Sequence, residues 1–520
     1  MTDNTYLLGI DFGTESVRAA IFDMTGRPVS FAATAYRTTH PHPGWAEQDP
    51  EEWWEALQAS CHKVIAASGV SPAAIKGISY DATTMTVVAM DKRGEALRPA
   101  IMWMDVRATE QAARAEKSDS VARLYNGRGT APATAEWYPF KAAWLRENER
   151  ETYDAAFRLV DAPDWVTYKL TGEWTTNINS AALRMYYNRD HGGWPVDFYE
   201  TIGCGDVFDK IPEKVVDLGT PVGELSVIAA QLLGLHPGTP VAQGPADAWA
   251  GQIGLGVVDP GVMALITGSS HVLTGQTDKP IHGKGFFGAY TDGVVKGQYT
   301  VEGGQVSTGS VLKWFKDNFA RDLIQAAEVT GLNVYDILNK QSKDLPHGSE
   351  GLIINEYFQG NRTPYTDSKA RGVIWGLSLH HGPAHIYRAI QESVCYGTAH
   401  NLRAMSAAGF EVKKIVAAGG ATKSRDWMQM HADVTGVPIA LTEVGDAVVL
   451  GSCMLAAVGA GLHPDLGTAA REMVHEIDLL EPNQRRHEEY QYFVDAYANT
   501  YPQLQPMIHD MVDRENAKRS

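Results

Sequence analysis

A pattern of strand, glycine turn and strand occurs twice in this chain, and it constrains the fold more than any other feature. The chain opens with YLLGID, the turn FGTES and the strand VRAAIFD, and the same order returns around residue 262 in GVMALITGSSHVLTGQ. Glycine and small polar residues between apolar runs predict tight turns between strands. The likeness of LGIDFGTES and ALITGSS is short, so chance remains the alternative. A true repeat would give two similar domains whose glycine turns face a shared cleft.

The segments between and after these turns predict helices that alternate with strands. EEWWEALQASCHKVIAAS begins after Asp49 and Pro50 and stops at Gly69, and the apolar run IKGISYD follows it. Further on, KKIVAAGGATKSRDWMQMHADVTGVPI predicts a strand, a double-glycine loop and a helix that stops at Gly436. The last segment predicts an amphipathic helix with an aromatic stripe. This alternation is typical of α/β domains, and 520 residues are too many for one compact core.

Composition excludes several classes of function. The formal net charge of -17 works against phosphate-backbone binding, so we expect no nucleic-acid partner. The four cysteines form no C-x-x-C pair, which argues against a zinc site or a disulfide framework. The N-terminus lacks the features of a signal peptide, and the longest apolar run, AVVLGSCMLAAVGAGL, is shorter than a membrane span. We therefore expect a soluble cytoplasmic protein without a membrane partner.

One carboxylate, Asp247, is isolated in the stretch PVAQGPADAWAGQIGLGVV. It is the only formally charged side chain between Glu224 and Asp259. An Asx-type turn or a helix N-cap explains most isolated aspartates near glycine and proline. The alternative is a catalytic base, which requires a substrate and a reaction from other parts of the chain.

The glycine turns have the chemistry of a phosphate site. In GIDFGTES a strand ends in Asp11, and Gly13 lets backbone N–H groups approach phosphate oxygens while the carboxylate holds Mg²⁺ directly or through water. The stretches ITGSSH and AAGGATKS offer two more turns that suit phosphate and a nucleoside. A plain hairpin turn is the alternative for any one of them.

Together these motifs resemble the FGGY carbohydrate kinases, members of the actin, sugar-kinase and Hsp70-like ATPase superfamily. GIDFGTESVRAAIFD, ITGSS and AAGGATKSRDWMQMHADVTGVPI are similar to the two phosphate motifs and the adenosine motif. GVIWGLSLHHGPAHIYRAIQE follows the family's C-terminal signature, except that Gln391 replaces an apolar residue. AEWYPFKAAWLREN keeps the Lys141 and Trp144 of the other signature, with Tyr138 at a position that is usually small or proline.

The resemblance implies an α/β fold with two ribonuclease-H-like domains of the actin and hexokinase type around a central cleft. We expect an N-terminal domain over residues 1–257, a C-terminal domain over 258–485 and a C-terminal helix over 486–520. It also implies ATP and Mg²⁺ as cofactors, Asp247 as the general base and Asp11 as the metal residue. The expected nucleotide contacts are Gly13, Thr14, Gly268, Ser269, Gly309, Gly419, Gly420, Ala421 and Ser424.

The substrate is expected to be a small sugar, most specifically D-ribulose. GISYDATTMTVVAMD, IMWMDVRA, VEGGQVSTG and FQGNRTPYTD are more similar to D-ribulose and other pentulose kinases than to glycerol kinases or xylulokinases. The candidate sugar contacts are Asp81, Trp103, Asp105, Arg184 and Glu302. Turn formation is the alternative for the two aspartates, core packing is the alternative for the tryptophan, and Arg184 rests on a loose alignment.

Three other functions stay open at this point. The first is a xylulokinase, and the second is a kinase of another ketose or polyol such as ribitol, erythritol or apulose. The third is a non-catalytic, Hsp70-like ATP-binding protein, against which the acid Asp247 argues. A homodimer is compatible with the sequence, which does not define the oligomeric state.

Overall fold

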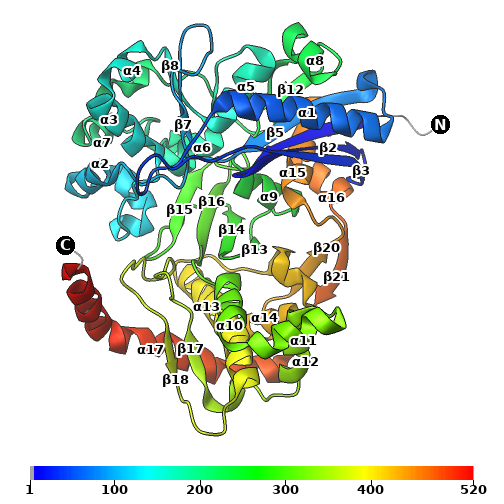
Figure 1. The fold of residues 1–520 in the computed structure, drawn as a ribbon. Helices are drawn as coiled ribbons and strands as arrows, with labels where there is room; N and C mark the ends of the chain where they lie inside the picture. The colour runs from blue at the N-terminus through cyan, green and yellow to red at the C-terminus, as the bar shows by residue number, and fades with distance from the viewer. Residues whose placement is uncertain (1–4, 519–520) are drawn as a thin grey trace.

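Two large β-sheets organise the molecule, which is a computed structural model that describes residues 5–518 (Figure 1). The first sheet is six-stranded, in the order β11-β12-β5-β1-β2-β3. Its strands are β1 (Tyr6–Phe12), β2 (Ser16–Asp23), β3 (Pro28–Ala35), β5 (Ile75–Ala82), β11 (Pro221–Glu224) and β12 (Pro240–Ala242). Strands β1, β2 and β3 pair antiparallel, whereas β1, β5 and β12 pair parallel.

The second large sheet is seven-stranded, in the order β15-β16-β14-β13-β19-β20-β21. Its strands are β13 (Val262–Thr267), β14 (His271–Thr277), β15 (Phe287–Thr291), β16 (Tyr299–Gln305), β19 (Lys414–Gly419), β20 (Ile439–Thr442) and β21 (Glu476–Leu480). The short strands are β4 (Glu47–Gln48), β6 (Val87–Met90), β7 (Ala100–Ile101), β8 (Arg158–Asp161), β9 (Thr176–Asn177), β10 (Val215–Val216), β17 (Ile353–Asn355) and β18 (Val373–Trp375).

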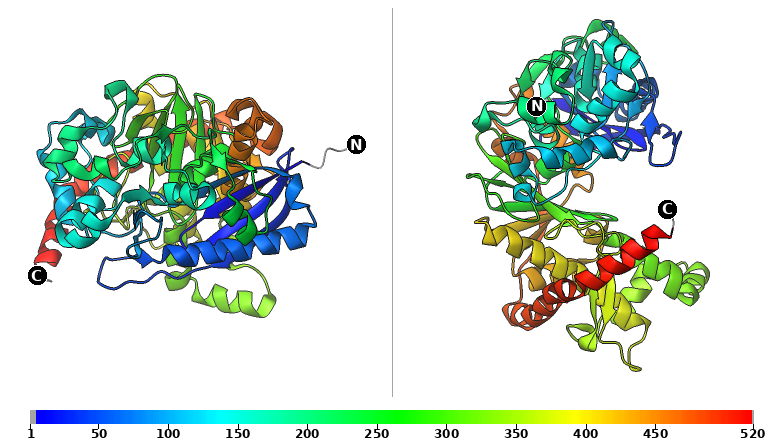
Figure 2. Two further views of the ribbon diagram at one scale, coloured as in Figure 1. Left: turned by 90° about the horizontal axis from the view of Figure 1, so that it is seen from above. Right: turned by 90° about the vertical axis from the view of Figure 1, so that its left-hand side faces the viewer.

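Helices cover both sheets, and the molecule has two lobes in Figure 2. The first half contains α1 (Pro50–Ser68), α2 (Thr109–Arg114), α3 (Tyr138–Asn148), α4 (Arg150–Ala155), α5 (Ala162–Thr171), α6 (Ile178–Arg184), α7 (Val196–Thr201), α8 (Val227–Leu233) and α9 (Asp247–Gly254). The second half contains α10 (Gly309–Phe319), α11 (Arg321–Thr330), α12 (Val334–Ser342), α13 (Pro383–Ala407), α14 (Arg425–Thr435), α15 (Ala447–Gly459), α16 (Leu466–Met473) and α17 (Gln484–Ala517).

The predicted repeat is confirmed by the topology of the two sheets. The order β3-β2-β1-β5-β12-β11 in the first sheet matches β16-β14-β13-β19-β20-β21 in the second. In each, an antiparallel meander leads to a central strand that pairs parallel with its next neighbour, β1 with β5 and β13 with β19. Because the glycine turns follow β1 and β13, they occupy equivalent places in the two lobes.

The predicted helices are also confirmed, with the capping residues that the sequence suggests. The Asp49 carboxylate accepts a hydrogen bond from the backbone N–H of Glu51 at the start of α1, and Gly69 ends this helix in the left-handed conformation. Helix α14 ends at Gly436 in the same conformation. Three aromatic residues of α17, Tyr490, Tyr497 and Tyr501, are buried, so packing is the role of this stripe, while Tyr492 is exposed.

One helix of the second half packs onto the sheet of the first half. Helix α15 contacts β1, β5, β12 and α9, and Figure 1 shows it beside the N-terminal strands. The crossing of α9 and α15 is close, because a Cβ on Gly451 would lie 1.9 Å from the carbonyl oxygen of Ala250. The domain boundary at residue 257 therefore stays a prediction. A helix that follows this boundary in the sequence packs against the sheet that precedes it. No helix among residues 5–518 is long and apolar enough to span a membrane.

Candidate active site

Three aspartates lie at one edge of the N-terminal sheet. Asp11 and Asp81 are register partners near the carboxyl ends of the parallel strands β1 and β5. A bridge between Ala82 and Ala246 brings the start of α9, and with it Asp247, to the same edge. Carboxyl ends of parallel strands are the usual place for a ligand in α/β proteins.

The environment of Asp11 suits a cation. Its carboxylate is fully buried and is contacted by the guanidinium of Arg18, which also donates a hydrogen bond of 2.9 Å to Asp446. The guanidinium lies at the Oδ2 of Asp11, whereas the Oδ1 of Asp11 and the Oδ1 of Asp81 accept no hydrogen bond from the N–H and O–H groups of residues 5–518. Burial raises the pKa of Asp11 to about 7, although Arg18 opposes the shift. Buried carboxylate oxygens without donors match the oxygen ligands that Mg²⁺ prefers.

Asp247 is the first residue of α9 and remains partly exposed. The N-cap position belongs to Ala246, so capping does not account for this aspartate. One carboxylate oxygen accepts a hydrogen bond of 2.7 Å from the backbone N–H of Ala248, and the other oxygen accepts none from residues 5–518. Burial raises the pKa of Asp247, while the Ala248 bond and the charge of Arg18 lower it. A raised pKa and one free oxygen are the properties of a usable base.

The expected nucleotide residues of the second half meet at one cavity of about 290 Å³. The predicted contacts Gly268, Gly309, Gly420, Ala421 and Ser424 line it. Leu312, Tyr335, Tyr387 and Trp427 contribute apolar and aromatic surface to the remaining walls. The other residues that line the cavity are polar. Predominantly apolar walls with a few polar groups are typical of small-molecule sites.

Close backbone contacts explain two of the glycines expected to contact the nucleotide, Gly419 and Gly309. Gly419 has a φ of +97°, and a Cβ there would lie 1.9 Å from the carbonyl oxygen of Thr267. At Gly309 a Cβ would lie 2.4 Å from the carbonyl oxygen of Gly268, which accepts a hydrogen bond of 3.2 Å from the Gly309 N–H. Ser269 lies in the same turn, where its carbonyl oxygen accepts hydrogen bonds from the backbone N–H groups of Thr308 and Ser310.

The first glycine turn lies in the other lobe, apart from that cavity. The N–H of Gly13 closes the hairpin by donating to the carbonyl oxygen of Ser16 at 3.1 Å. The hydroxyl of Thr14 accepts a hydrogen bond of 3.0 Å from the indole N–H of Trp103. A candidate sugar residue and a candidate phosphate residue are therefore in direct contact.

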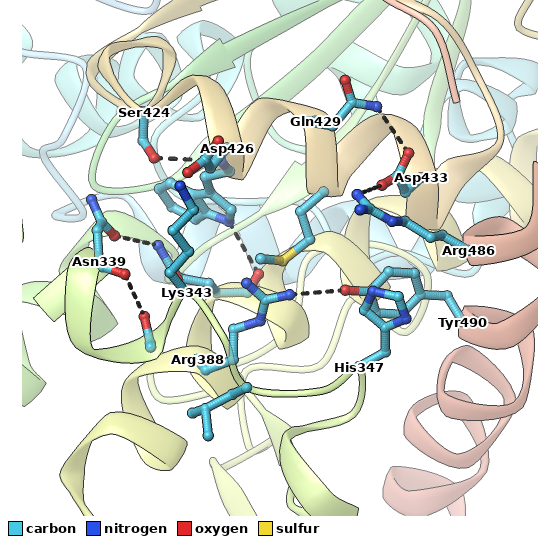
Figure 3. Close-up of a pocket in the computed structure, with 15 residues that line it drawn as sticks. Asn339, Lys343, His347, Arg388, Ser424, Asp426, Gln429, Asp433, Arg486 and Tyr490 are labelled. Atoms are coloured by element: carbon cyan, nitrogen blue, oxygen red, sulfur yellow. Dashed lines mark hydrogen bonds and ion pairs between the residues drawn. The ribbon is translucent and has the colours of Figure 1, made fainter. Parts of the chain in front are cut away.

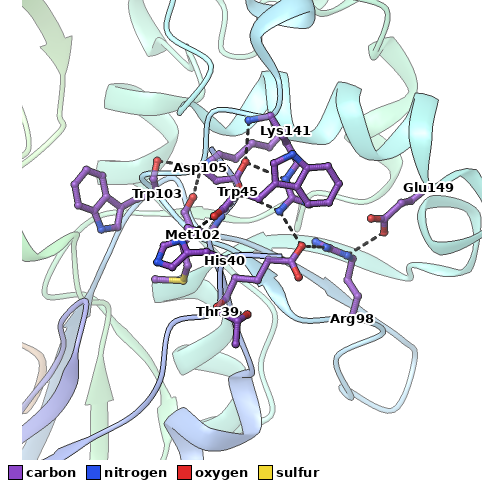
Figure 4. A network of polar contacts seen from close by, with 12 residues as sticks. Thr39, His40, Trp45, Arg98, Met102, Trp103, Asp105, Lys141 and Glu149 are labelled. Carbon is purple, nitrogen blue, oxygen red and sulfur yellow. Dashed lines mark hydrogen bonds and ion pairs between the residues drawn. The ribbon is translucent and has the colours of Figure 1, made fainter. Parts of the chain in front are cut away.

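A buried lysine holds the segment that carries Trp103 (Figure 4). The ammonium of Lys141 donates to the carbonyl oxygens of Met85, Met102 and Trp103 at 2.8, 2.6 and 3.2 Å. Burial lowers the pKa of Lys141 to about 7, although the charge of Asp105 raises it. Asp105 itself accepts hydrogen bonds from the Ala46 N–H and the Arg107 guanidinium.

Arg184 and Glu302, two candidate sugar contacts, form an ion pair between the two halves of the sequence. A nitrogen of Arg184 on α6 lies 2.7 Å from a carboxylate oxygen of Glu302 on β16, and both side chains are buried. The guanidinium lies over the rings of Trp137 and Trp249. Its Nε is buried and has no hydrogen-bond partner among residues 5–518.

Two of the expected sugar contacts are fully buried. Asp81 and Asp105 have no exposed surface, so neither can touch a sugar in this conformation. Asp81 accepts a hydrogen bond of 2.7 Å from the hydroxyl of Ser452 on α15, and Asp105 organises the loop around Ala46. Both carboxylates thus accept hydrogen bonds inside the protein, which favours a structural role for these two aspartates.

Arg18 is a site residue that sequence reasoning missed. It lies on β2 directly after the first glycine turn and faces Asp11 across the hairpin. In the sequence, Arg18 stands out as the single cationic residue of the otherwise largely apolar strand SVRAAIFD. A charged residue on a largely buried strand needs a partner, and that requirement could have indicated it.

The paired sheets and their glycine turns define a two-domain ATPase of the actin and hexokinase fold class. The chain belongs to the FGGY family of carbohydrate kinases. The family's N-terminal domain matches residues 6–254 and its C-terminal domain matches residues 263–460. The enzyme is therefore an ATP-dependent sugar kinase, as the sequence motifs predict.

Several relatives cover nearly the whole chain. An FGGY carbohydrate kinase domain-containing protein of Xenopus laevis is 31% identical, with 95% of each chain covered. A ribulokinase of Anoxybacillus flavithermus is 30% identical over 88% of this chain and 86% of its own. The crystal structure of a xylulose kinase from Rhodospirillum rubrum is 26% identical, with a TM-score of 0.86, and covers 97% of this chain and 100% of its own.

Proposed function

We propose that this kinase phosphorylates a ketopentose, D-ribulose in particular, with Asp247 as the general base. The observation that carries the proposal is the position of Asp247, a partly exposed carboxylate with a free oxygen at the same sheet edge as Asp11. A glycine-lined nucleotide cavity in the opposite lobe supplies the place for the phosphate donor.

In the reaction that we infer, Asp247 accepts the proton of a sugar hydroxyl as its oxygen attacks the γ-phosphorus of ATP. The bond between that phosphorus and the oxygen bridging to the β-phosphate breaks, and ADP leaves. Alignment and charge neutralisation account for most catalysis in phosphoryl transfer. Asp11 would hold Mg²⁺, which neutralises phosphate charge when bound. Arg18 is a further cation beside Asp11.

The sugar would bind beside Trp103 and the ion pair of Arg184 and Glu302. The indole offers a flat face to C–H groups, and the ion pair of Arg184 and Glu302 offers donor and acceptor groups for sugar hydroxyls. The motifs VEGGQVSTG and FQGNRTPYTD favour a ribulokinase-type substrate. Similarity to a xylulose kinase of known structure keeps D-xylulose as the second candidate.

The test is ADP release measured by a coupled assay over ketopentoses, tetruloses, ribitol and glycerol. D-Ribulose should give the highest kcat/KM, ahead of D-xylulose and well ahead of glycerol. These two ketoses differ only at C3, so a buried hydrogen-bonding group that loses its partner must separate them, by roughly ten- to a hundredfold. Glu302→Ala should compress that ratio. A tenfold preference for D-xylulose or a tetrulose would refute the ribulose assignment, and ADP release that no sugar stimulates would favour a non-catalytic ATP-binding protein.

A further inference from the structure

A buried glutamine lies against the first glycine turn, in the lobe opposite to the nucleotide cavity. Gln48 is the second residue of β4, directly before the Asp49 cap of α1, and its side chain is 2% exposed. Its amide nitrogen donates a hydrogen bond of 2.7 Å to the backbone carbonyl oxygen of Thr14. Burying an amide so completely costs free energy unless both of its polar atoms find partners.

The orientation of this amide is fixed at both ends. The indole N–H of Trp53 donates a hydrogen bond of 2.7 Å to the Oε1 of Gln48, and an indole can only donate. At the other end, the carbonyl oxygen of Thr14 can only accept. Turning the amide over would therefore place two donors face to face at Trp53 and two acceptors face to face at Thr14. Trp53 is itself buried and packs edge-on against the ring of Trp165, so the donor that sets the orientation is held in place.

The fixed amide also fixes one peptide group of the glycine turn. In a trans peptide the C=O group and the following N–H group point in opposite directions. The bond from Gln48 to the Thr14 carbonyl oxygen therefore turns the N–H of Glu15 away from Gln48. Gln48 lies on the buried side of the turn, whereas Glu15 is exposed. The N–H of Glu15 donates no hydrogen bond to residues 5–518, so the exposed side of the turn presents a backbone donor without an internal acceptor.

We propose that Gln48 is a positioning residue for phosphoryl transfer, which holds the N–H of Glu15 in the direction of the phosphate oxygens of the nucleotide. Backbone N–H groups stabilise phosphate charge best when their direction is set before the reaction. The inference rests on the proposed function, because it takes the first glycine turn to receive the phosphates when the two lobes come together. Gln48 itself touches neither the sugar nor the nucleotide in this scheme.

A second hydrogen bond holds the same turn from the sugar side. The indole N–H of Trp103 donates to the hydroxyl of Thr14 at 3.0 Å, so Thr14 is held at its side chain by a candidate sugar contact and at its backbone by Gln48. Only the bond from Gln48 acts on the peptide group that carries the N–H of Glu15. Loss of the glutamine amide should therefore disturb this donor even where the Trp103 bond remains.

The experiment compares kcat, the KM for the sugar and the affinity for ADP in variants of the full-length protein. The sugar is D-ribulose, or the best substrate that the coupled assay identifies. Gln48→Met keeps the side-chain length but cannot donate to Thr14, and it should lower kcat roughly ten- to a hundredfold. The KM for the sugar and the ADP affinity should stay near the wild-type values, because Gln48 contacts neither ligand.

Gln48→Glu separates positioning from packing, and it also serves if the methionine variant folds poorly. Its carboxyl group keeps an acceptor for the indole of Trp53, and burial raises the pKa of such a group. The protonated form can donate to the Thr14 carbonyl oxygen, whereas the ionised form cannot. The kcat of Gln48→Glu relative to wild type should therefore recover as the pH falls, while the ratio for Gln48→Met should not change with pH. A role in packing alone predicts no such recovery.

Thr38→Val is the matched control. The hydroxyl of Thr38 accepts another hydrogen bond of 2.7 Å from the same amide nitrogen, so this variant removes one bond of Gln48 and leaves the bond to Thr14. It should keep the wild-type kcat. Lys343→Ala is a control in the other lobe, because Lys343 lines a cavity of about 230 Å³ that adjoins the nucleotide cavity (Figure 3). It should change neither kcat nor its pH dependence.

Two results would overturn the inference. One is a folded Gln48→Met protein with the kcat of Thr38→Val, and the other is a Gln48→Glu protein whose kcat relative to wild type does not respond to pH. Either result would leave Gln48 as a buried residue that only packs against α1. A wild-type protein whose ADP release no sugar stimulates would instead contradict the proposed function, so the two failures are distinguishable.

Discussion

Three carboxylates at one sheet edge have different roles because their surroundings differ. Asp81 is buried against Ser452, Asp11 is buried against Arg18, and Asp247 keeps a free oxygen and some exposure. Burial disfavours the charged form in each case, and the pKa of each is raised. Only Asp247 combines a raised pKa with access to a substrate.

Asp247→Asn should lower kcat by roughly 10²- to 10⁴-fold while ADP and sugar still bind, because the amide keeps the shape but cannot accept the proton. Steady-state kinetics with the coupled assay and calorimetry for ADP would measure both effects. Asp259→Asn removes an exposed acid shortly after the same helix and should leave kcat unchanged. A near-normal rate in Asp247→Asn would return this residue to the turn-forming role.

Lys141 predicts a specific pH dependence of stability. Its pKa falls from 10.5 to about 7 on folding. Between these values the unfolded chain binds a proton that the folded protein has lost. The free energy of unfolding should therefore rise with pH across this window, by up to about 1.4 kcal/mol per pH unit.

Urea unfolding of the wild type and of Lys141→Met between pH 7 and pH 10 would measure this pH dependence of the free energy of unfolding. The variant should lack the rise, so the two curves should not run parallel. The groups that face the ammonium are Asp105, Glu136, Asp161 and Arg107. Lys92→Met, at an exposed lysine, should keep the wild-type slope. Parallel curves for wild type and Lys141→Met would contradict the lowered pKa.

At the scale of elements, the crossing of α9 and α15 fixes the position of the base. Helix α9 begins at Asp247, and α15 approaches it closely at Gly451 and Gly254. A Cβ on Gly254 would lie 1.7 Å from the carbonyl oxygen of Ala447, which only a shift of one helix could relieve. Glycine at these two positions therefore sets the distance between the helices.

Gly451→Ala should destabilise the protein by about 1 to 3 kcal/mol, because the added methyl group overpacks the crossing. It should also lower kcat more than it changes the KM for ATP, since the start of α9 moves and the nucleotide cavity is in the other lobe. Urea unfolding and steady-state kinetics test both parts. Gly445→Ala is the matched control, because its Cβ would meet nothing within 4 Å. Equal effects of the two substitutions would contradict the importance of the crossing.

At the scale of the whole molecule, the base and the nucleotide cavity belong to different lobes. Asp247 lies at the edge of the N-terminal sheet, whereas Gly309 and Ala421 line the cavity beside the second sheet. Transfer of a phosphoryl group requires the base and the nucleotide to come together and water to be excluded. Domain closure achieves both in many kinases.

Small-angle scattering should therefore show a smaller radius of gyration with D-ribulose and a non-hydrolysable ATP analogue together than for the ligand-free protein. The ATP analogue alone serves as the control and should give a smaller change. An unchanged radius with both ligands at saturation would contradict closure by hinge motion.

The sequence alone determined several of the secondary elements, the strand, turn and strand repeat, and the places of the glycine turns. These are local properties: the Asp49 cap, the Gly69 and Gly436 stops and the strand pattern around each glycine turn depend on a few neighbouring residues. It also marked Asp247, because an isolated acid among small residues is visible without a structure.

Tertiary structure decided which polar residues face a ligand. The burial of Asp81 depends on Ser452, 371 residues away in sequence, and the ion pair of Arg184 and Glu302 joins residues 118 apart. No local pattern encodes such partners, because they arise only when α15 packs on the first sheet and the two halves meet. The same aspartate can be a surface acid or a buried hydrogen-bond acceptor, and the free energy of its surroundings decides between them.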